Sequence, residues 1–191
     1  EIIALADISL VGTMGYIFEE FENNFSDLEL LQTTLAAAED VGYFPPNLES
    51  VAVLQPDLII SGQYLESNDE LRAIAPTVVL DFNRTFFWED IVRTTGELLG
   101  ETEVVNDLFD EYQARLDTLG EYIENPSEIE VSVVRIMEGE ISMNLVETFP
   151  SNILSDAGLG RPESQAYSEA EAQAAYGNSL AVTISLEELQ L

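Results

Sequence analysis

The sequence predicts a parallel α/β fold, and two of its patterns lead to this prediction. Short amphipathic segments alternate with apolar runs that lack polar alternation, as at residues 58–60 and 77–80. Strands buried on both faces have this continuous apolar character, which is typical of parallel sheets covered by helices. In addition, one apolar stripe continues over residues 103–123, which predicts a helix about 30 Å long. A helix of this length can span two lobes.

The elements before this long helix are expected to be short. Asn47 is a suitable N-cap for the helix that begins at Leu48, and Pro56 prevents the continuation of that helix. Gly100 is expected to close the helix that Trp88 opens. The expected order is the end of a helix at 2–8, a strand at 10–12, helices at 27–39 and 48–55, a strand at 58–60, a helix at 68–73, a strand at 77–80 and a helix at 88–99.

The alternation resumes beyond the Asn-Pro break that follows the long helix. Strands are expected at residues 129–136 and 141–145, joined as a hairpin by a Glu-Gly turn. Residues 153–157 are expected to form a short helix, and residues 186–191 open a helix that the chain does not finish. Because the first residues lead directly into an element, we expect the chain to be trimmed at its N-terminus.

The composition excludes several classes of function. The chain has 37 acidic residues against six basic ones, all arginine, which gives a net charge of -31 over 191 residues. Nucleic acid is excluded as a partner, because phosphate binding needs clustered cations. The chain contains no cysteine and no histidine, which excludes thiolate catalysis, cysteine-bound metals and the common catalytic triads. We therefore expect no metal site and no resident cofactor. No apolar run approaches the ~20 residues of a membrane-spanning helix.

Eight short motifs follow one another along nearly the whole chain. They are PNLESV (46–51), LQPDLII (54–60), LRAIAPTVVL (71–80), LLGE (98–101), YQARL (112–116), VSVVR (131–135), ILSDAGLGRP (153–162) and ISLEEL (184–189). In this order the motifs resemble those of the iron-siderophore and cobalamin substrate-binding proteins of bacterial ABC importers. The combination is specific, whereas any one motif alone is a weak signal.

The resemblance implies a class III substrate-binding protein, in which a long rigid helix joins two Rossmann-like lobes that hold a ligand in the cleft between them. By that pattern residues 1–101 form the N-terminal lobe without its first strand, residues 102–125 the interlobe helix, and residues 126–191 the start of an incomplete C-terminal lobe. The chain is thus expected to be truncated at both ends. The implied location is the periplasm, or the cell surface by way of a lipid anchor.

The resemblance also implies the function. A monomer would capture a ferric siderophore and deliver it to a membrane permease, without catalysis. The iron stays wrapped by its chelator, so the protein needs no metal ligands of its own. Hydroxamate binders of the family place an arginine just before the PNLE-like motif, and this chain departs from that pattern, because it has Tyr43, Phe44 and Pro45 there.

Topology indicates where a ligand would bind. In parallel sheets ligands bind beyond the carboxyl ends of the strands. Tyr64 follows a buried strand at the point where Gly62 lets the chain turn, and it is expected to contact the ligand; alternatively, it only covers the end of the sheet. The FNRTF segment after the next strand supplies Arg84 and Phe86, and Trp88 follows as a further candidate.

The six arginines divide into groups. Arg84 and Arg135 lie outside the expected helices, so they have no helical ion-pair partner, and they fall at or near strand ends, where a guanidinium can bind an anionic chelate. Arg161, in GLGRP, is expected to tie down a turn. The others each follow an acidic residue by three or four positions on an expected helix, a spacing typical of surface ion pairs: Arg72, Arg93 and Arg115.

Acidic residues precede the LRAIAP motif. The resemblance implies that an acid in this neighbourhood docks against arginines of the permease, and the candidates are Glu66, Asp69 and Glu70. The alternative is that these residues belong to an ordinary solvated surface, since so acidic a chain has a carboxylate near almost any position.

Three other interpretations stay open. Cobalamin or haem binding on the same fold would be favoured by a site rich in aromatic residues and poor in arginine. A carboxylate-based enzyme has no motif in its support, because G-x-G-x-x-G, G-x-x-x-x-G-K-[ST] and G-x-S-x-G are all absent. A non-transport interaction module would have an exposed apolar patch and an empty cleft.

Overall fold

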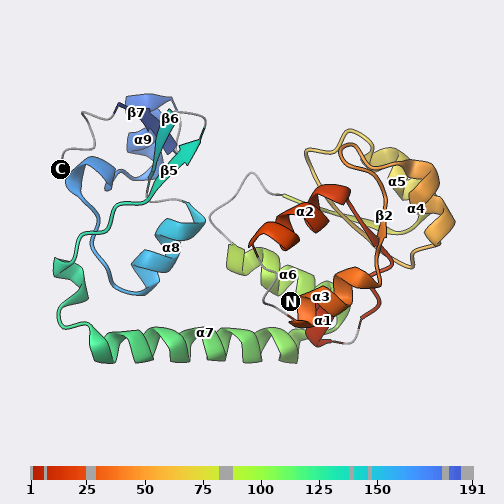
Figure 1. The fold of residues 1–191 in the computed structure, drawn as a ribbon, viewed down its shortest axis with the longest axis horizontal. Coiled ribbons are helices and arrows are strands. Elements are labelled where there is room, and N and C mark those ends of the chain that lie inside the picture. Colours follow the sequence, from red (N-terminus) through yellow and green to blue (C-terminus); the bar gives the residue numbers. More distant parts are fainter. Residues whose placement is uncertain are drawn as a thin grey trace. The chain divides into compact units, whose positions relative to one another are not determined.

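The computed structural model describes residues 2–6, 8–24, 29–81, 88–137, 140–145, 148–177 and 181–185. It divides into two compact units, shown in Figure 1. Unit 1 consists of Glu1–Arg84 with Glu89–Asn106, and unit 2 of Thr85–Trp88 with Asp107–Leu191. None of the helices in the described part of the chain is long and apolar enough to cross a membrane.

Unit 1 alternates helices with short parallel strands. Strand β1 pairs with β2, and β3 pairs with β4, both in parallel, as the sequence predicts for this region. The elements are α1 (Ile2–Leu5), β1 (Gly12–Thr13), α2 (Gly15–Asn24), α3 (Glu29–Ala36), β2 (Glu39–Asp40), α4 (Leu48–Leu54), β3 (Ile59–Gly62), α5 (Asn68–Ile74), β4 (Thr77–Leu80) and most of α6 (Trp88–Leu99).

Local signals explain the bounds of α4. The side chain of Asn47 accepts hydrogen bonds from the backbone N–H groups of Glu49 and Ser50, both at 3.0 Å. The helix ends at Gln55, which has a φ of 49°, immediately before Pro56. Both ends were predicted from the sequence. The apolar face of α4 helps to form the core of unit 1, whose buried members are Val41, Val51 and Leu71.

The region before α4 differs from the prediction. Residues 27–39 were expected to form one helix, but within the described residues α3 covers only Glu29–Ala36, and Glu39 belongs to a strand. Pairing with β1 is the physical reason, because the N–H of Glu39 donates to the carbonyl of Val11, and the N–H of Val41 donates to that of Thr13. Helix α2 was not predicted at all.

Unit 2 contains a three-stranded antiparallel sheet of order β5-β6-β7. The predicted hairpin is present as β5 and β6, although the first strand is shorter than expected, and α9 was not predicted. The core is formed by Met143, Leu145 and Ala172. The elements are the larger part of α7 (Thr102–Tyr122), η1 (Pro126–Glu128), β5 (Val134–Met137), β6 (Glu140–Asn144), α8 (Phe149–Asp156), η2 (Glu163–Gln165), α9 (Glu169–Tyr176) and β7 (Ala181–Ile184).

The long helix forms where the sequence predicts it. Its predicted bounds, residues 103–123, agree with α7 to within one residue at each end. Figure 1 shows α7 as one unbroken helix. Its first five residues belong to unit 1 and the others to unit 2. The helix expected at residues 186–191 lies outside the described residues.

Candidate functional site

Four aromatic residues of unit 1 follow the ends of parallel strands. Tyr16 lies in the first turn of α2, directly after β1, while Tyr43 and Phe44 follow β2 and Tyr64 follows β3. The carboxyl ends of parallel strands are the edge at which α/β proteins bind ligands. We call these four residues the aromatic cluster.

The rings of the aromatic cluster contact one another in a chain. Tyr16 and Tyr43 meet edge to face, with ring centroids 5.9 Å apart, and Phe44 and Tyr64 stack with centroids 6.0 Å apart. The phenol of Tyr64 lies close enough to that of Tyr16 to affect its pKa, so the two pairs are neighbours. Tyr43, Phe44 and Tyr64 nevertheless remain 60%, 53% and 49% exposed. Contiguous exposed aromatic surface of this kind marks an interaction site.

A glycine sets the position of the Tyr64 ring. A Cβ atom added to Gly62 would lie 2.3 Å from Cε1 of Tyr64, closer than any real side chain can approach. The ring therefore folds back over the backbone at the end of β3, which only a glycine permits. This contact explains why a buried strand ends in a glycine shortly before a tyrosine.

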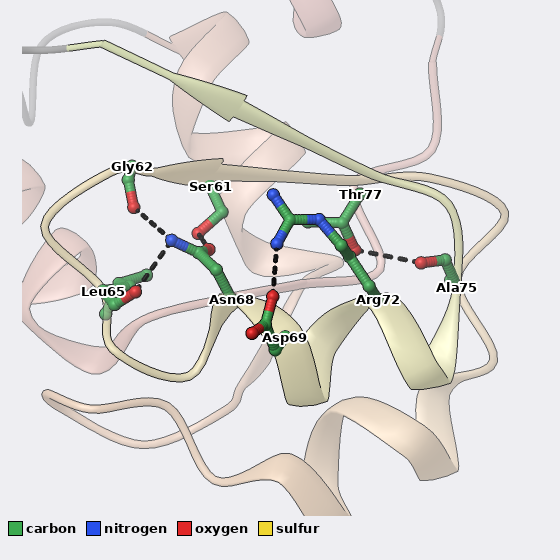
Figure 2. A network of polar contacts seen from close by, with 8 residues as sticks. All are labelled: Ser61, Gly62, Leu65, Asn68, Asp69, Arg72, Ala75 and Thr77. Atoms are coloured by element: carbon green, nitrogen blue, oxygen red, sulfur yellow. Dashed lines mark hydrogen bonds and ion pairs between the residues drawn. The ribbon is translucent and has the colours of Figure 1, made fainter.

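A side chain of α5 holds the loop that carries Tyr64 (Figure 2). The amide of Asn68 donates hydrogen bonds to the carbonyls of Gly62 at 2.9 Å and Leu65 at 2.7 Å. Its Oδ1 accepts a hydrogen bond of 2.6 Å from the hydroxyl of the buried Ser61. One carboxamide thus bridges the end of β3 and the far side of the loop.

The phenol of Tyr16 is neutral at physiological pH. Burial raises the pKa of Tyr16 above its ordinary value near 10, and the nearby phenol of Tyr64 raises it further. A neutral phenol both donates and accepts hydrogen bonds. The aromatic cluster can therefore offer ring faces and hydroxyl groups to a planar, oxygen-rich ligand.

Two of the other predicted ligand residues, Arg135 and Trp88, belong to unit 2. Arg84 and Phe86 lie outside the described residues. Arg135 is exposed on β5, opposite Ser142 of β6 in unit 2. The sequence analysis did not identify Tyr16 or Asn68. Tyr16 lies shortly after the strand expected at residues 10–12, and Asn68 is the first residue of the helix expected at residues 68–73, so both positions could have been considered.

Trp88 lies in a second aromatic group, which belongs to unit 2. Its indole stacks on Phe109 at 5.6 Å and meets Tyr112 and Phe149 edge to face at 5.4 Å and 5.7 Å between ring centroids. The hydroxyl of Tyr112 donates a 2.8 Å hydrogen bond to Asp156. These contacts give Trp88 a packing role, and its role in ligand binding stays a prediction.

The acidic docking candidates lie on the surface. Glu66, Asp69 and Glu70 are all exposed, in the loop before α5 and in its first turn. Asp69 accepts a hydrogen bond of 2.7 Å from Arg72, and its side chain is 93% exposed. Two of the predicted surface ion pairs are confirmed: Arg72 with Asp69 and Arg115 with Glu111.

Arg161 ties together separate segments of unit 2, which extends the predicted role in a turn. Its guanidinium donates to the backbone carbonyl of Asn144 and to the side chain of Gln165, which in turn donates to Ser132. Burial lowers the pKa of Arg161 below its ordinary value. Its Nε and one terminal nitrogen are buried without a partner in the described residues.

No cluster of three or more carboxylates suited to a metal ion occurs in the part of the chain that the structure describes.

Comparisons with known proteins agree on one family. A model of the periplasmic binding protein family matches residues 40–143. The chain is 29% identical over 140 residues to a probable siderophore-binding lipoprotein, YfiY of Bacillus subtilis, covering 72% of this chain and 43% of that protein. It is 30% identical over 140 residues to the achromobactin-binding periplasmic protein of Dickeya dadantii, covering 68% and 44%.

Solved structures of siderophore-binding proteins have a fold similar to that of this chain. The siderophore-binding protein FhuD of Vibrio cholerae, solved with Fe3+-Desferal bound, superimposes with a TM-score of 0.74 at 21% identity. The match covers 99% of this chain and 70% of that one. The chain spans less than half the length of the two curated relatives described above.

Proposed function

Because the chain belongs to the periplasmic binding protein family and has the α/β fold of its class III members, we propose that it captures a ferric siderophore for an ABC importer. One observation carries this proposal, namely the partly exposed aromatic cluster at the carboxyl ends of β1, β2 and β3. The Bacillus subtilis relative is named a probable siderophore-binding lipoprotein, which supports the same ligand class.

The chemistry of the aromatic cluster suits the rim of a ferric chelate. Siderophore rims are planar or rich in carbonyl groups, so aromatic faces and phenol groups can contact them over a large area. Arg84 and Arg135 are proposed to supply the positive charge that an anionic chelate needs, since a guanidinium binds carboxylate and catecholate oxygens with paired hydrogen bonds. Phe86 and Trp88 are proposed as further aromatic contacts.

Delivery is proposed to use the acidic surface beside the aromatic cluster. Glu66, Asp69 and Glu70 are exposed near the loop that carries Tyr64, so their carboxylates are accessible to a partner. A basic patch on the membrane permease is the complementary surface. We propose that the protein acts as a monomer in the periplasm or anchored at the cell surface, that it binds no nucleic acid, and that it transfers its ligand without catalysing a reaction.

Isothermal titration calorimetry tests the ligand class. The panel consists of a ferric trishydroxamate, a ferric triscatecholate, a ferric carboxylate chelate, cobalamin and haem. We expect one of the ferric chelates to bind most tightly. Preference for cobalamin or haem, which an aromatic site poor in arginine would favour, would replace the proposed ligand, and the absence of any binding would support an interaction module instead.

A matched pair of variants connects binding to the aromatic cluster. Tyr64→Ala removes a ring that stacks on Phe44, and it should weaken binding of the preferred chelate by about tenfold, or ~1.4 kcal/mol. Tyr122→Ala serves as the control, because Tyr122 is 82% exposed at the end of α7 and outside the aromatic cluster. Equal affinities of the two variants would place the ligand elsewhere.

A further inference from the structure

The loop between β3 and α5 depends on one side chain for much of its shape. Within this loop the N–H of Leu65 donates to the carbonyl of Gly62 at 3.1 Å. That same carbonyl accepts a second hydrogen bond from Asn68, which also binds the carbonyl of Leu65. Leu65 is buried, so the far side of the loop is anchored in the core. Tyr64 lies between these two fixed carbonyl groups.

The side chain of Asn68 does not cap the helix that this residue begins. Asparagine is a poor residue for a helix interior, because its side chain competes for nearby backbone groups. The preceding residue, Ser67, occupies the N-cap position but makes no capping hydrogen bond with its side chain. The hydrogen bonds of the Asn68 carboxamide described above go instead to Ser61, Gly62 and Leu65, which belong to β3 and its loop.

We propose that Asn68 is a positioning residue for ligand binding: it fixes the loop at residues 62–65, so that the Tyr64 ring stays against Gly62 and stacked on Phe44. This proposal rests on the proposed function, since it assigns a role within the same aromatic cluster. Asn68 itself need not touch the ligand. Its effect passes through Tyr64, whose ring lies against Gly62 with about half of the residue's surface exposed to solvent.

An isosteric substitution isolates the two donated hydrogen bonds. Asn68→Asp keeps an oxygen that can accept from Ser61, but it replaces the amide by an oxygen that faces the carbonyls of Gly62 and Leu65. Two attractive contacts thereby become repulsive. The matched control is Asn106→Asp, which makes the same chemical change and adds the same charge at an exposed position of α7.

The first measurement needs no ligand. Nuclear Overhauser contacts between the ring protons of Phe44 and Tyr64 report their stacking directly, because the ring centroids are 6.0 Å apart. We expect these contacts in the wild type and in Asn106→Asp, and their loss in Asn68→Asp. Asn68→Ala, which adds no charge, repeats the test if the aspartate variant does not fold. Persistence of the contacts in a folded Asn68 variant would overturn the proposal whether or not a siderophore binds.

The second measurement is a double-mutant cycle with the three ferric chelates as probes. Asn68→Asp should weaken binding of the preferred chelate by about tenfold, yet have no further effect when Tyr64→Ala is already present. Additive losses would show that Asn68 acts independently of Tyr64 and would refute the positioning role. Failure of the wild type to bind any chelate would instead refute the proposed function, while the ring contacts would still decide the role of Asn68.

Discussion

At the scale of single residues, the geometry around Gly62 makes the aromatic cluster sensitive to one methyl group. Gly62 does not have a positive φ, so the backbone tolerates an alanine there. The added Cβ would, however, meet the ring of Tyr64. The ring of Tyr64 can move away from the added Cβ at a small cost in stability. Phe44 then loses its stacking contact with that ring. Stability and binding should therefore respond differently to this substitution.

We expect Gly62→Ala to leave the melting temperature nearly unchanged and to weaken chelate binding by about tenfold. Thermal unfolding and calorimetric titration measure the two quantities on the same sample. The prediction would be contradicted by a large loss of stability, which would mean that the displaced ring disrupts the core, or by unchanged affinity.

The titration of Tyr16 provides a second prediction at this scale. Burial is the largest cause of its raised pKa, and the phenol of Tyr64 adds to it. Tyr64→Phe should thus lower the pKa of Tyr16 toward its ordinary value without restoring that value fully. Tyrosine labelled at Cζ and followed by NMR over pH measures the change, with Tyr122→Phe as the control. An unaltered Tyr16 titration would show that the two phenols do not interact.

The same shift has a consequence for stability. Because the folded state holds the proton of Tyr16 more tightly than the unfolded state does, the contribution of this proton to stability is complete below about pH 10. It is lost as the pH rises through the folded-state pKa. Tyr64→Phe should move this loss to lower pH.

The candidate site could be predicted from the sequence only in part. Tyr64 was found because a buried strand, a glycine and an aromatic residue follow one another in the chain. Tyr16 was missed because α2, the helix that carries it just after β1, was not predicted from the sequence. Asn68 was missed because its function depends on loop carbonyls, and backbone groups leave no trace in residue types.

At the scale of elements, α4 and α7 could be predicted because their signals are local. Helix α4 has a capping asparagine and a terminating proline, and α7 has a continuous apolar stripe. Strand β2 consists of Glu39 and Asp40, which are exposed and have low strand propensity, so only its pairing with β1 makes it a strand. Helix α9 does carry a local signal, the capping box of Ser168 and Glu171, which the sequence analysis did not use.

Helix α7 offers a stabilising substitution. Gly120 lies within the last turn of this helix, and a Cβ added there would have no heavy atom within 4 Å. Gly120→Ala should raise the free energy of unfolding by about 0.5–1 kcal/mol, because glycine loses more backbone freedom than alanine in a helix. Urea denaturation measures the gain. A decrease in stability would indicate that this turn of α7 is not helical in solution.

At the scale of the whole molecule, the net charge of -31 opposes compactness. At ~0.15 M ionic strength, interactions between exposed charges are screened beyond about 8 Å. We therefore expect the midpoint of urea denaturation to rise with sodium chloride between ~0.01 M and ~0.15 M. An Asp69→Asn variant, which removes one charge and its pairing with Arg72, should keep nearly the same slope. A midpoint independent of salt would contradict the role of self-repulsion.

Docking to the permease is also a property of the whole molecule. Lysine substitution of both Asp69 and Glu70 should abolish siderophore uptake in a reconstituted transporter and leave ligand affinity unchanged, because these exposed side chains would face the partner and not the ligand. The same double substitution at Glu121 and Glu124, exposed residues at and beyond the end of α7, is the control. Normal uptake by the Asp69 and Glu70 variant would exclude this surface.

The placement of Trp88 determines what intrinsic fluorescence can report. It is the only tryptophan of the chain, and its indole is surrounded by Phe109, Tyr112 and Phe149 within unit 2. Selective excitation of tryptophan therefore follows the loss of packing in unit 2, whereas circular dichroism averages over the helices of both units. If the two optical signals change at the same denaturant concentration, the two units unfold in one cooperative transition. If the signals change at different concentrations, each unit unfolds with its own stability.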